Sequence, residues 1–470
     1  MKRILCLVLV ASASWIGPVA IAQAPRPQVG TPRRFTPPRA IESSLPNGLT
    51  LTLVPYGTLP TAQVELVILA GTADETSGQV GIAELVGDYL REGSRSRNAD
   101  VLAREISGLG VVGGEIGILT RPCETWVGGE VLSESTPALV ELIGDLVQRP
   151  AFAPEALPRL KANQVRRLSM RRTQPATLAS TRINALLFPN HPSDRIPTDE
   201  QVQGLALDDV RRFHATHFVA RRAHLYVAGV FDAPVVEAAV RRAFGAWAPG
   251  DAKPRALDTP RERGDSRTDQ RPVIHWLDRP GASQARIQVS TPIVDPGHPD
   301  HQILNLLNIM LGSVQTSRII ANVRERHGYS YNVSSRLVRR PGSSQWALTA
   351  DVANNVTGAA LREILAELAR VVAEPPADDE LRRHQAFLAG VLITENATPA
   401  GILDTLRNFD LYGVDAEYRA NFVERVRDIA PADIQRVART YFQPHDLVIV
   451  VVGNRAAVAS QLASVGKLTD

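Results

Sequence analysis

The first residues whose types and spacing could do chemistry lie in the stretch Gly81–Ser94, GIAELVGDYLREGS, which follows a strand-like run and a short polar loop. This stretch predicts an amphipathic helix on which Glu84, Gly87 and Asp88 share one face, because they stand three and four residues apart. Two histidines and a glutamate at this spacing would bind zinc and activate a water molecule. The spacing is present here but the histidines are not, so the helix is a lost site, a changed site or an ordinary structural element.

A second candidate pair is Arg324 and Tyr331, seven residues apart in RERHGYSY. We expect Arg324 to lie near the end of a helix, Gly328 to cap that helix and Tyr331 to open a strand. Arginine is a permanent cation with several hydrogen-bond donors and the tyrosine hydroxyl is a neutral donor, so both side chains could donate hydrogen bonds. The alternative is a surface salt bridge for Arg324 and a core position for Tyr331.

The remaining candidate patterns indicate no further chemistry. His214 and His217 stand three apart without an acidic residue between them, and Cys123 has no identifiable base. Neither a Gly-x-Ser-x-Gly pattern nor a phosphate-binding glycine loop occurs. Glu84 and Asp88 by themselves could hold a hard cation loosely, but two carboxylates do not make a closed zinc site.

The elements that must position these residues occur twice in the chain. The Pro- and Arg-rich stretch 249–272 has the composition of a linker, and it separates two segments with the same order of strands and helices. Each segment closes with a short helix, an aromatic residue and a strand that ends in glycine. An internal duplication of roughly 200-residue units follows. Several strands pair through tight turns, which predicts mixed sheets with helices on one face. Strands near Thr50 and Val127 are expected to form edges that an extended peptide could join.

Composition and charge exclude some classes of function. A chain of 470 residues with 44% hydrophobic residues is expected to form two to four domains. Its formal charge is only +3, and its arginines are scattered among acids, so nucleic acid is not an expected partner. No segment beyond the N-terminus is long and apolar enough to span a membrane.

The N-terminus predicts export. Lys2 and Arg3 precede an apolar run that ends in the small-x-small pattern of Ala20 and Ala22. We expect residues 1–22 to be a signal peptide cleaved after about Ala22, residues 23–43 to be a Pro/Arg-rich arm, and the protein to be periplasmic. After cleavage only Cys123 remains, so an internal disulfide is impossible.

Four motifs, in this order and spacing, resemble those of the M16 metallopeptidases, the pitrilysin-like or inverzincin family. They are LPNGLTLTLVPY, AGTADETSGQVGIAELVGDYLREGS, YVAGVFD and VRERHGYSYNVSS, and the likeness runs from about Leu45 to Asn454. The resemblance implies an α+β fold of two homologous LuxS/MPP-like α/β domains, residues 44–247 and 273–470, joined by a linker at 248–272. Each would have a mixed, largely antiparallel sheet with helices on one face, and the chain would form half of a clam shell around a chamber.

The same resemblance locates a changed zinc site. The family's H-x-x-E-H motif falls on Glu84, Gly87 and Asp88, and its third ligand falls on Arg167, or on Arg166 if the register slips by one. Glycine has no side chain that could act as a base, and an arginine would pair with Glu84 or Asp88 instead of binding a metal. This chain is therefore expected to bind no zinc, and its helix to keep only its packing face, which consists of Ile82, Leu85 and Leu90.

The resemblance also implies a role for the second candidate pair. In the family the arginine and tyrosine lie across the chamber from zinc and hold the substrate backbone, and Gly312 and Ser313 belong to a loop that lines the chamber. The expected function is that of a non-zinc subunit of a heterodimeric peptidase, inactive alone, with zinc on the partner chain and a peptide as substrate. An inert structural or peptide-binding homologue is the alternative. An independent enzyme that uses Glu84 and Asp88 with another metal is a third possibility.

Overall fold

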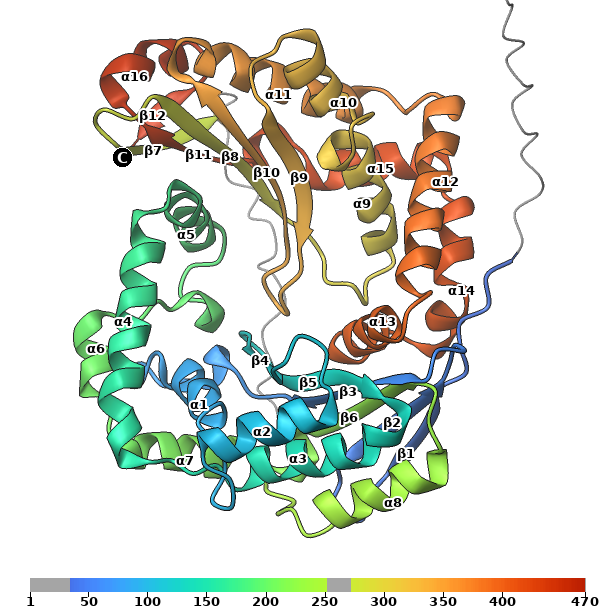
Figure 1. Cartoon of the computed structure of the whole chain (residues 1–470). Helices are drawn as coiled ribbons and strands as arrows, with labels where there is room; N and C mark the ends of the chain where they lie inside the picture. The colour runs from blue at the N-terminus through green and yellow to red at the C-terminus, as the bar shows by residue number, and fades with distance from the viewer. Residues whose placement is uncertain (1–33, 252–271, 470) are drawn as a thin grey trace, which may run out of the picture. The chain divides into compact units, whose positions relative to one another are not determined.

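Two six-stranded mixed sheets organise the chain, one in each half (Figure 1). The computed structural model describes residues 34–251 and 272–469. The expected signal peptide at 1–22, the expected arm up to residue 33 and the expected linker from 252 to 271 lie outside the described residues. From Phe35 onward the chain forms one unit by its internal contacts.

The two sheets have the following strands. The first has the order β1-β2-β6-β3-β5-β4 and consists of β1 (Ile41–Ser44), β2 (Thr50–Pro55), β3 (Thr61–Ile68), β4 (Gly117–Thr120), β5 (Thr125–Leu132) and β6 (Ala223–Gly229). The second has the order β12-β7-β11-β8-β10-β9 and consists of β7 (Val273–Asp278), β8 (Gln284–Pro292), β9 (Asn332–Val338), β10 (Gln345–Ala353), β11 (Val448–Gly453) and β12 (Lys467–Thr469).

The two sheets share one topology over five strands. Strands β2, β6, β3, β5 and β4 correspond in order and direction to β7, β11, β8, β10 and β9. In each set the first pair is parallel and the other three pairs are antiparallel. The halves differ at the outer edge, where β1 pairs antiparallel with β2 whereas β12 pairs parallel with β7. The expected duplication and the mixed, largely antiparallel sheets are confirmed.

The helices follow the same repeated order. In the first half they are α1 (Ile82–Leu90), α2 (Ala99–Leu109), α3 (Thr136–Gln148), α4 (Leu157–Thr173), α5 (Pro175–Leu187), α6 (Asp199–Gly204), α7 (Leu207–His217) and α8 (Ala233–Phe244). In the second half they are α9 (Asp300–Asn308), α10 (Arg318–Ile320), α11 (Thr357–Ala373), α12 (Asp378–Glu395), α13 (Pro399–Leu411), α14 (Ala416–Arg427), α15 (Pro431–Tyr441) and α16 (Arg455–Ala463). Two π-helical segments, Ile309–Ser313 and Ala321–Arg326, flank α10. By position between equivalent strands, α1, α4 and α5 correspond to α9, α12 and α13.

Alternating apolar residues place a helical layer on one face of each sheet. In β3 the side chains of Ala62, Val64, Leu66 and Ile68 alternate along the strand and are fully buried in the core of the first half. The same core includes buried side chains of α1, α3 and α8. An equivalent core in the second half joins β8, β10 and β11 to α9, α11 and α15. Side chains two residues apart share one face of a strand, so the alternating pattern determines which face of the sheet the helices cover.

The opposite face of each sheet is covered in part by one helix from the other half (Figure 1). Val448, Val450 and Val452 of β11 pack against α5, which belongs to the first half. In the same way Val54, Val67 and Tyr226 pack against α13, which belongs to the second half. Helices α5 and α13 are topological counterparts, so each half packs the equivalent helix against the sheet of the other half. This reciprocal contact was not among the expectations from the sequence.

The sheet edges differ from the expectation. β2, which contains Thr50, lies between β1 and β6, and β5, which contains Val127, lies between β3 and β4. The two edges of the first sheet are instead the four-residue strands β1 and β4. All four residues of β1 are exposed, so it has no apolar alternation by which the sequence could reveal a strand.

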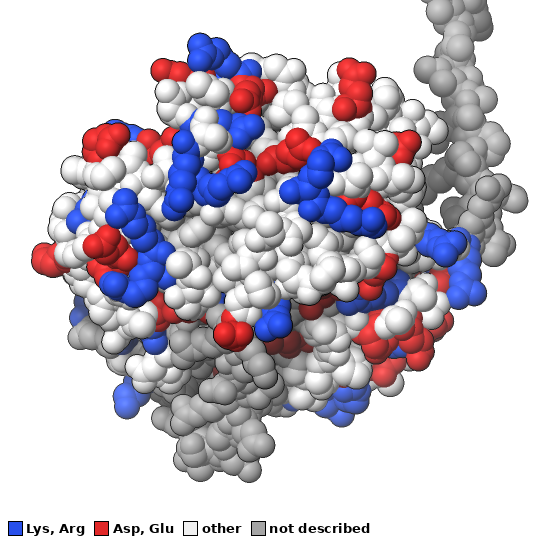
Figure 2. Space-filling view, turned by 90° about the horizontal axis from the view of Figure 1, so that it is seen from below, with Lys and Arg blue, Asp and Glu red and all other residues white. Residues whose placement is uncertain are grey.

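The surface charge is mixed. Lysines and arginines are interspersed with acids over the face seen in Figure 2, so no continuous basic field forms there. Among the described residues, one helical stretch, Asp300–Arg326, is long and apolar enough to cross a membrane. It lies mostly inside the protein, as the core helix of a folded domain does, so it is weak support for a membrane span.

Candidate functional site

Helix α1 carries the first candidate group, and a buried carboxylate fixes its start. Glu75 accepts hydrogen bonds from the backbone amides of Gly81 at 3.0 Å and Ala83 at 2.9 Å. These amides lack partners within the helix, so the carboxylate replaces a capping side chain. Burial raises the pKa of Glu75 to about 7, although the two amides oppose the shift.

One face of α1 packs into the core and the other meets α4. Ile82, Leu85 and Leu90 are fully buried, which confirms the expected packing face. On the other face Asp88 accepts a hydrogen bond from Arg167 of α4, with 2.6 Å between the atoms. This confirms that an arginine pairs with one of the two α1 carboxylates. Burial raises the pKa of Asp88, and the hydrogen bond and charge of Arg167 oppose that rise.

A second ion pair lies one helical turn further along α4. Arg171 is 3.4 Å from Glu84, so each carboxylate of the candidate group has its own arginine. Arg166 is exposed and donates to Asn163 of its own helix. The structure therefore favours Arg167 over Arg166 as the residue that faces α1.

Gly87 has no room for a side chain. A Cβ atom built at this position would be 2.6 Å from Oγ1 of Thr120 in β4, well inside normal contact distance. The hydroxyl of Thr120 thus occupies the place where a side chain at position 87 would begin. A water-activating group at this position would require β4 to shift.

The four positions do not fit a zinc ion. Zinc is bound by histidine, cysteine or carboxylate groups with free lone pairs, whereas Asp88 and Glu84 are engaged by arginines and position 87 has no donor atom. Within residues 34–251 and 272–469, no three His, Cys, Asp or Glu side chains come together as a metal site would require. The group is a pair of ion pairs that joins α1 to α4.

The second candidate pair lies at the end of a π-helical segment. Arg324 belongs to Ala321–Arg326, and the amide of Gly328 donates to its carbonyl oxygen at 3.1 Å. Gly328 has a φ of +65°, a left-handed conformation that glycine adopts without strain. Its predicted capping role is confirmed. The guanidinium of Arg324 is 3.3 Å from Glu325 and remains partly exposed.

Tyr331 is the last residue before β9, and its side chain is 85% exposed. The alternative of a core aromatic is therefore wrong for this residue. Exposure of a large aromatic ring costs hydrophobic stabilisation, so packing does not explain this tyrosine. In the described part of the chain, no hydrogen bond or ion pair connects Arg324 or Tyr331 to Glu84, Asp88 or Arg167.

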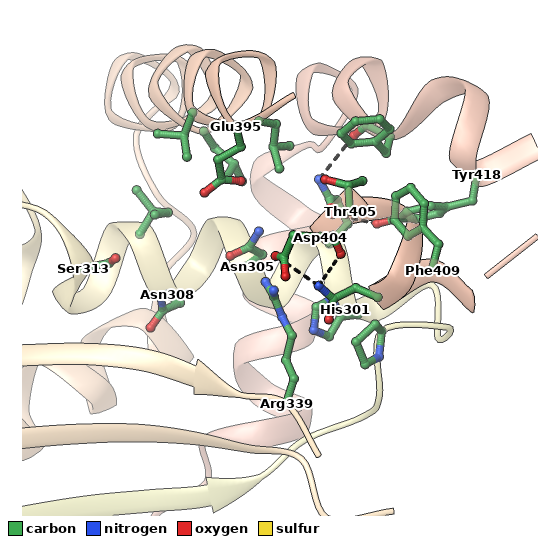
Figure 3. A pocket seen from close by; sticks show the side chains of 18 residues that line it. His301, Asn305, Asn308, Ser313, Arg339, Glu395, Asp404, Thr405, Phe409 and Tyr418 are labelled. Atoms are coloured by element: carbon green, nitrogen blue, oxygen red, sulfur yellow. Dashed lines mark hydrogen bonds between the residues drawn. The ribbon is translucent and has the colours of Figure 1, made fainter. Parts of the chain in front are cut away.

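Gly312 and Ser313 lie at the end of the other π-helical segment. Gly312 is buried, and a Cβ atom there would be 2.8 Å from Oγ of Ser335 in β9. Ser313 is exposed and lines a cavity between α9, α12 and α13 (Figure 3). The two positions therefore differ, because one is a close-packing site and the other faces open space.

Three residues of these sites were missed in the sequence. Arg171 follows Arg167 by four residues, a helical spacing that could have revealed it as a second partner for α1. Glu75 caps α1 from a preceding turn, and no capping spacing identifies it. Arg339 lines the same cavity as Ser313, and only the tertiary structure places it there.

Two family models match the chain. The model described as Insulinase (Peptidase family M16) matches residues 54–195, and the model described as Peptidase M16 inactive domain matches residues 204–388. A curated relative, an uncharacterized zinc protease of Mycobacterium tuberculosis, is 26% identical over 352 residues, which cover 74% of this chain and 76% of the relative.

Solved structures share the fold. The peptidase M16 inactive domain from Pseudomonas fluorescens superposes with a TM-score of 0.80 at 21% identity, covering 89% of this chain and 99% of that chain. The periplasmic protease PqqL from Escherichia coli has a TM-score of 0.74 at 14% identity. That match covers 95% of this chain but only 49% of PqqL, so this chain spans about half of that protease.

Proposed function

The chain belongs to the M16 peptidase family, and from that premise we propose that it is the non-zinc subunit of a two-chain M16 peptidase. A separate zinc-bearing M16 chain would be its partner, and an unfolded peptide its substrate. Arg324 and Tyr331 would bind the peptide backbone from this side. By itself this subunit would cleave no peptide.

The exposed hydroxyl of Tyr331 is the observation that carries the proposal. At 85% exposure the ring contributes little to the core, yet the hydroxyl is a neutral donor that a ligand can reach. Arg324 is nearby in the chain and partly exposed, and within the described residues its guanidinium pairs with its neighbour Glu325 alone. An exposed pair of this kind costs little to separate, so the guanidinium is available to a peptide carbonyl.

The state of α1 supports a role beside a zinc-bearing chain. Two ion pairs and a close glycine contact take the places of the metal ligands and the base. Zinc bound by a partner would polarise the peptide carbonyl and activate water. Arg324 and Tyr331 would then orient the backbone and donate hydrogen bonds where negative charge develops on the carbonyl oxygen.

The comparison with PqqL supports the pairing by length. The match covers 49% of that periplasmic protease, whose chain is therefore about twice as long as this one. A second chain of similar size would supply the missing half. The same neighbour supports the proposal that this chain is exported, with cleavage after about Ala22. N-terminal sequencing of the protein from a periplasmic fraction tests that cleavage site.

Co-expression with a zinc-bearing M16 chain tests the proposed function. The partner is an exported H-x-x-E-H chain from the same genome, and the readouts are co-purification and cleavage of an unfolded peptide. We expect cleavage only by the pair. Arg324→Gln and Tyr331→Phe are each expected to lower kcat about 10²-fold, the loss typical of one oxyanion donor, while the pair still forms.

Arg326→Gln is the matched control, because Arg326 is an exposed arginine of the same segment without an assigned role. Full activity of both test variants would contradict the role of the pair. Failure of any zinc-bearing chain to bind would favour the alternative, an inert structural or peptide-binding homologue. Metal-dependent cleavage by this chain alone would favour an independent enzyme.

The proposed domain boundaries accompany this function. Residues 44–247 and 273–470 would be the two M16-like domains and 248–272 their linker. Each stretch has its own sheet and its own apolar core, except that Ile41–Ser43 of the edge strand β1 lie in the expected arm. Limited proteolysis with mass spectrometry tests the boundaries, since a linker is expected to be cut before either domain.

A further inference from the structure

A cavity of about 290 Å³ lies in the second half, between α9, α12, α13 and α14 (Figure 3). Helices α9 and α12 are the topological counterparts of α1 and α4. The cavity therefore occupies, in the second half, the position that the two ion pairs fill in the first. Its volume is at the lower end of the range of small-molecule sites.

Several polar side chains of this cavity have no partner. Arg339, which directly follows β9, reaches toward Asn305 of α9, and Glu395 of α12 points into the same space (Figure 3). Among the described residues, Arg339, Asn305 and Glu395 make no side-chain hydrogen bond or ion pair, with one another or with other groups. Arg339 and Glu395 are both exposed to solvent, so a ligand that enters the cavity can reach their charged groups.

A buried histidine adds a further unused group. His301 of α9 lines the cavity and is only 4% exposed, and its Nε2 has no hydrogen-bond partner among the described residues. A buried polar atom without a partner is costly. Burial, together with the positive charge of the nearby Arg339, lowers the pKa of His301 to about 3, so the imidazole is neutral.

The other carboxylate of the cavity is already engaged. Asp404 of α13 accepts hydrogen bonds from Arg407 and from Asn408. Among the described residues that line the cavity, Glu395 is thus the anion without a partner and Arg339 the cation without one. Apolar side chains of α12, among them Leu388 and Leu392, complete the lining. The cavity therefore offers one positive group, one negative group and an apolar wall.

We propose that this cavity binds a small zwitterion of the amino-acid class, either a free apolar α-amino acid or a dipeptide that contains one. The ligand's carboxylate binds Arg339 and Asn305, its ammonium binds Glu395, and its side chain packs against Leu388 and Leu392. The proposal does not depend on the partner chain or on peptide cleavage.

The physical match is in sign, size and shape. An arginine binds a carboxylate through two parallel hydrogen bonds, and charge-assisted bonds of this type are stronger than neutral ones. A ligand with only one charge would leave either Arg339 or Glu395 unpaired in the site. A ligand without an apolar side chain would leave the α12 wall uncovered.

Isothermal titration of the purified mature chain tests the proposal. The probes are L-leucine, L-leucyl-L-leucine, N-acetyl-L-leucine, which lacks the ammonium, and L-leucinamide, which lacks the carboxylate. We expect Arg339→Gln to weaken leucine binding about ten- to a hundredfold, as for loss of a charged hydrogen bond, and to leave leucinamide unaffected. Glu395→Gln is expected to weaken leucine but not N-acetyl-leucine.

Arg336→Gln is the matched control, since Arg336 is an exposed arginine of β9, three residues before Arg339, that does not line the cavity. A thermal melt of each variant shows that it is folded. If leucine binds more tightly than leucyl-leucine, the ligand is a free amino acid; if the dipeptide binds more tightly, the ligand is a dipeptide. Both results support the proposal. Equal leucine affinity in wild type and Arg339→Gln, or no binding of either zwitterion up to about 20 mM, would overturn it.

Discussion

Helices α1 and α4 of the first half and helices α9 and α12 of the second half occupy equivalent positions on equivalent sheets, yet their facing surfaces differ. Between α1 and α4, Asp88 pairs with Arg167 and Glu84 with Arg171. Between α9 and α12, Glu395 and, from the end of β9, Arg339 line a cavity, and neither has a side-chain partner among the described residues. The charged side chains between α1 and α4 pair with each other, whereas Arg339 and Glu395 at the α9–α12 cavity remain unpaired among the described residues.

This difference shows that a shared topology does not decide what a helix pair does. Backbone geometry places residues three and four apart on one face in both pairs. Only the side chains decide whether those faces bind each other or leave space for a ligand. In the first half each anion has a cation within reach, and that satisfies the surface internally.

The starts of α1 and α9 differ in the same way. Glu75, which caps α1, has a pKa raised to about 7, chiefly by burial. Asp300, at the start of α9, is also buried, but Arg436 at 2.7 Å and Tyr441 at 3.1 Å hold its carboxylate. Burial by itself would raise the pKa of Asp300, and these partners lower it overall.

The largest expected effect is a pH-dependent stability that originates at Glu75. In the folded protein the carboxyl group of Glu75 keeps its proton up to about pH 7, whereas in the unfolded chain it loses the proton near its ordinary pKa of 4.5. Stability therefore falls as pH rises from about 4.5 to about 7, by an amount on the order of 3 kcal/mol. Urea unfolding of wild type and Glu75→Gln across this range measures the difference.

In Glu75→Gln this decline is expected to disappear, while the exposed Glu134→Gln control is expected to keep it. Parallel pH profiles for wild type and Glu75→Gln would contradict the assignment. Asp300 acts in the opposite direction. Its contribution is present above about pH 3.8 and is lost as pH falls through its lowered pKa.

The next effect concerns the ion pair that closes the α1–α4 surface. Arg167→Gln leaves Asp88 partly buried without its cation, and we expect a loss of about 1–2 kcal/mol, less than for a fully buried pair because Arg167 is 39% exposed. Arg166→Gln is the control on the exposed side of α4. The double variant Arg167→Gln/Asp88→Asn is expected to recover most of the loss, and no recovery would contradict the pairing.

Because Gly87 contacts β4, we expect a Gly→Ala substitution there to have the opposite effect on stability from the same substitution at an open helical position. Alanine is favoured over glycine in a helix by about 1 kcal/mol, and Gly108→Ala in α2, where a Cβ atom meets nothing within 4 Å, should stabilise the protein. Gly87→Ala is expected to destabilise it by about 1 kcal/mol, because the Cβ atom clashes with Thr120. In a Thr120→Ala background the same change should stabilise; thermal unfolding measures both.

The smallest effect is expected for the outer ion pair. Arg171 and Glu84 are 3.4 Å apart, and more than half of the Arg171 side chain is exposed. Arg171→Gln should therefore cost less than about 0.5 kcal/mol, and the cost should vanish in high salt. A loss as large as that of Arg167→Gln would show that the two pairs act as one network.

Much of the fold could be predicted from local pattern. Alternation in β3 and the buried face of α1 follow from periodicity, and the repeated order of elements predicted the duplicated sheets. The exposed edge strand β1 and the reciprocal packing of α5 and α13 could not be predicted. This edge strand lacks alternation, and the packing of α5 on β11 depends on residues far apart in the chain, such as Ile183 and Val450 of one apolar cluster.

For the candidate sites, the sequence predicted which chemistry each position could support better than it predicted what each side chain contacts. It identified Glu84, Gly87, Asp88 and Arg167 as positions that lack zinc chemistry, and the structure adds what each of them contacts. The functional roles of Arg324 and Tyr331 stay predictions. The exposure of Tyr331 could not be read from the sequence, since a tyrosine before a strand is as often buried.

The sequence by itself determined the spacing of residues on each helix, the faces that enter the cores and the duplication, because these follow from helical and strand periods and from repeated order. Only the tertiary structure decided which charges meet. Arg167 lies 79 residues from Asp88, and Arg339 and Glu395 reach one cavity from the loop after β9 and from α12. Coulombic and hydrogen-bond energies depend on distance and burial, which the chain acquires only when the sheets and helices have packed.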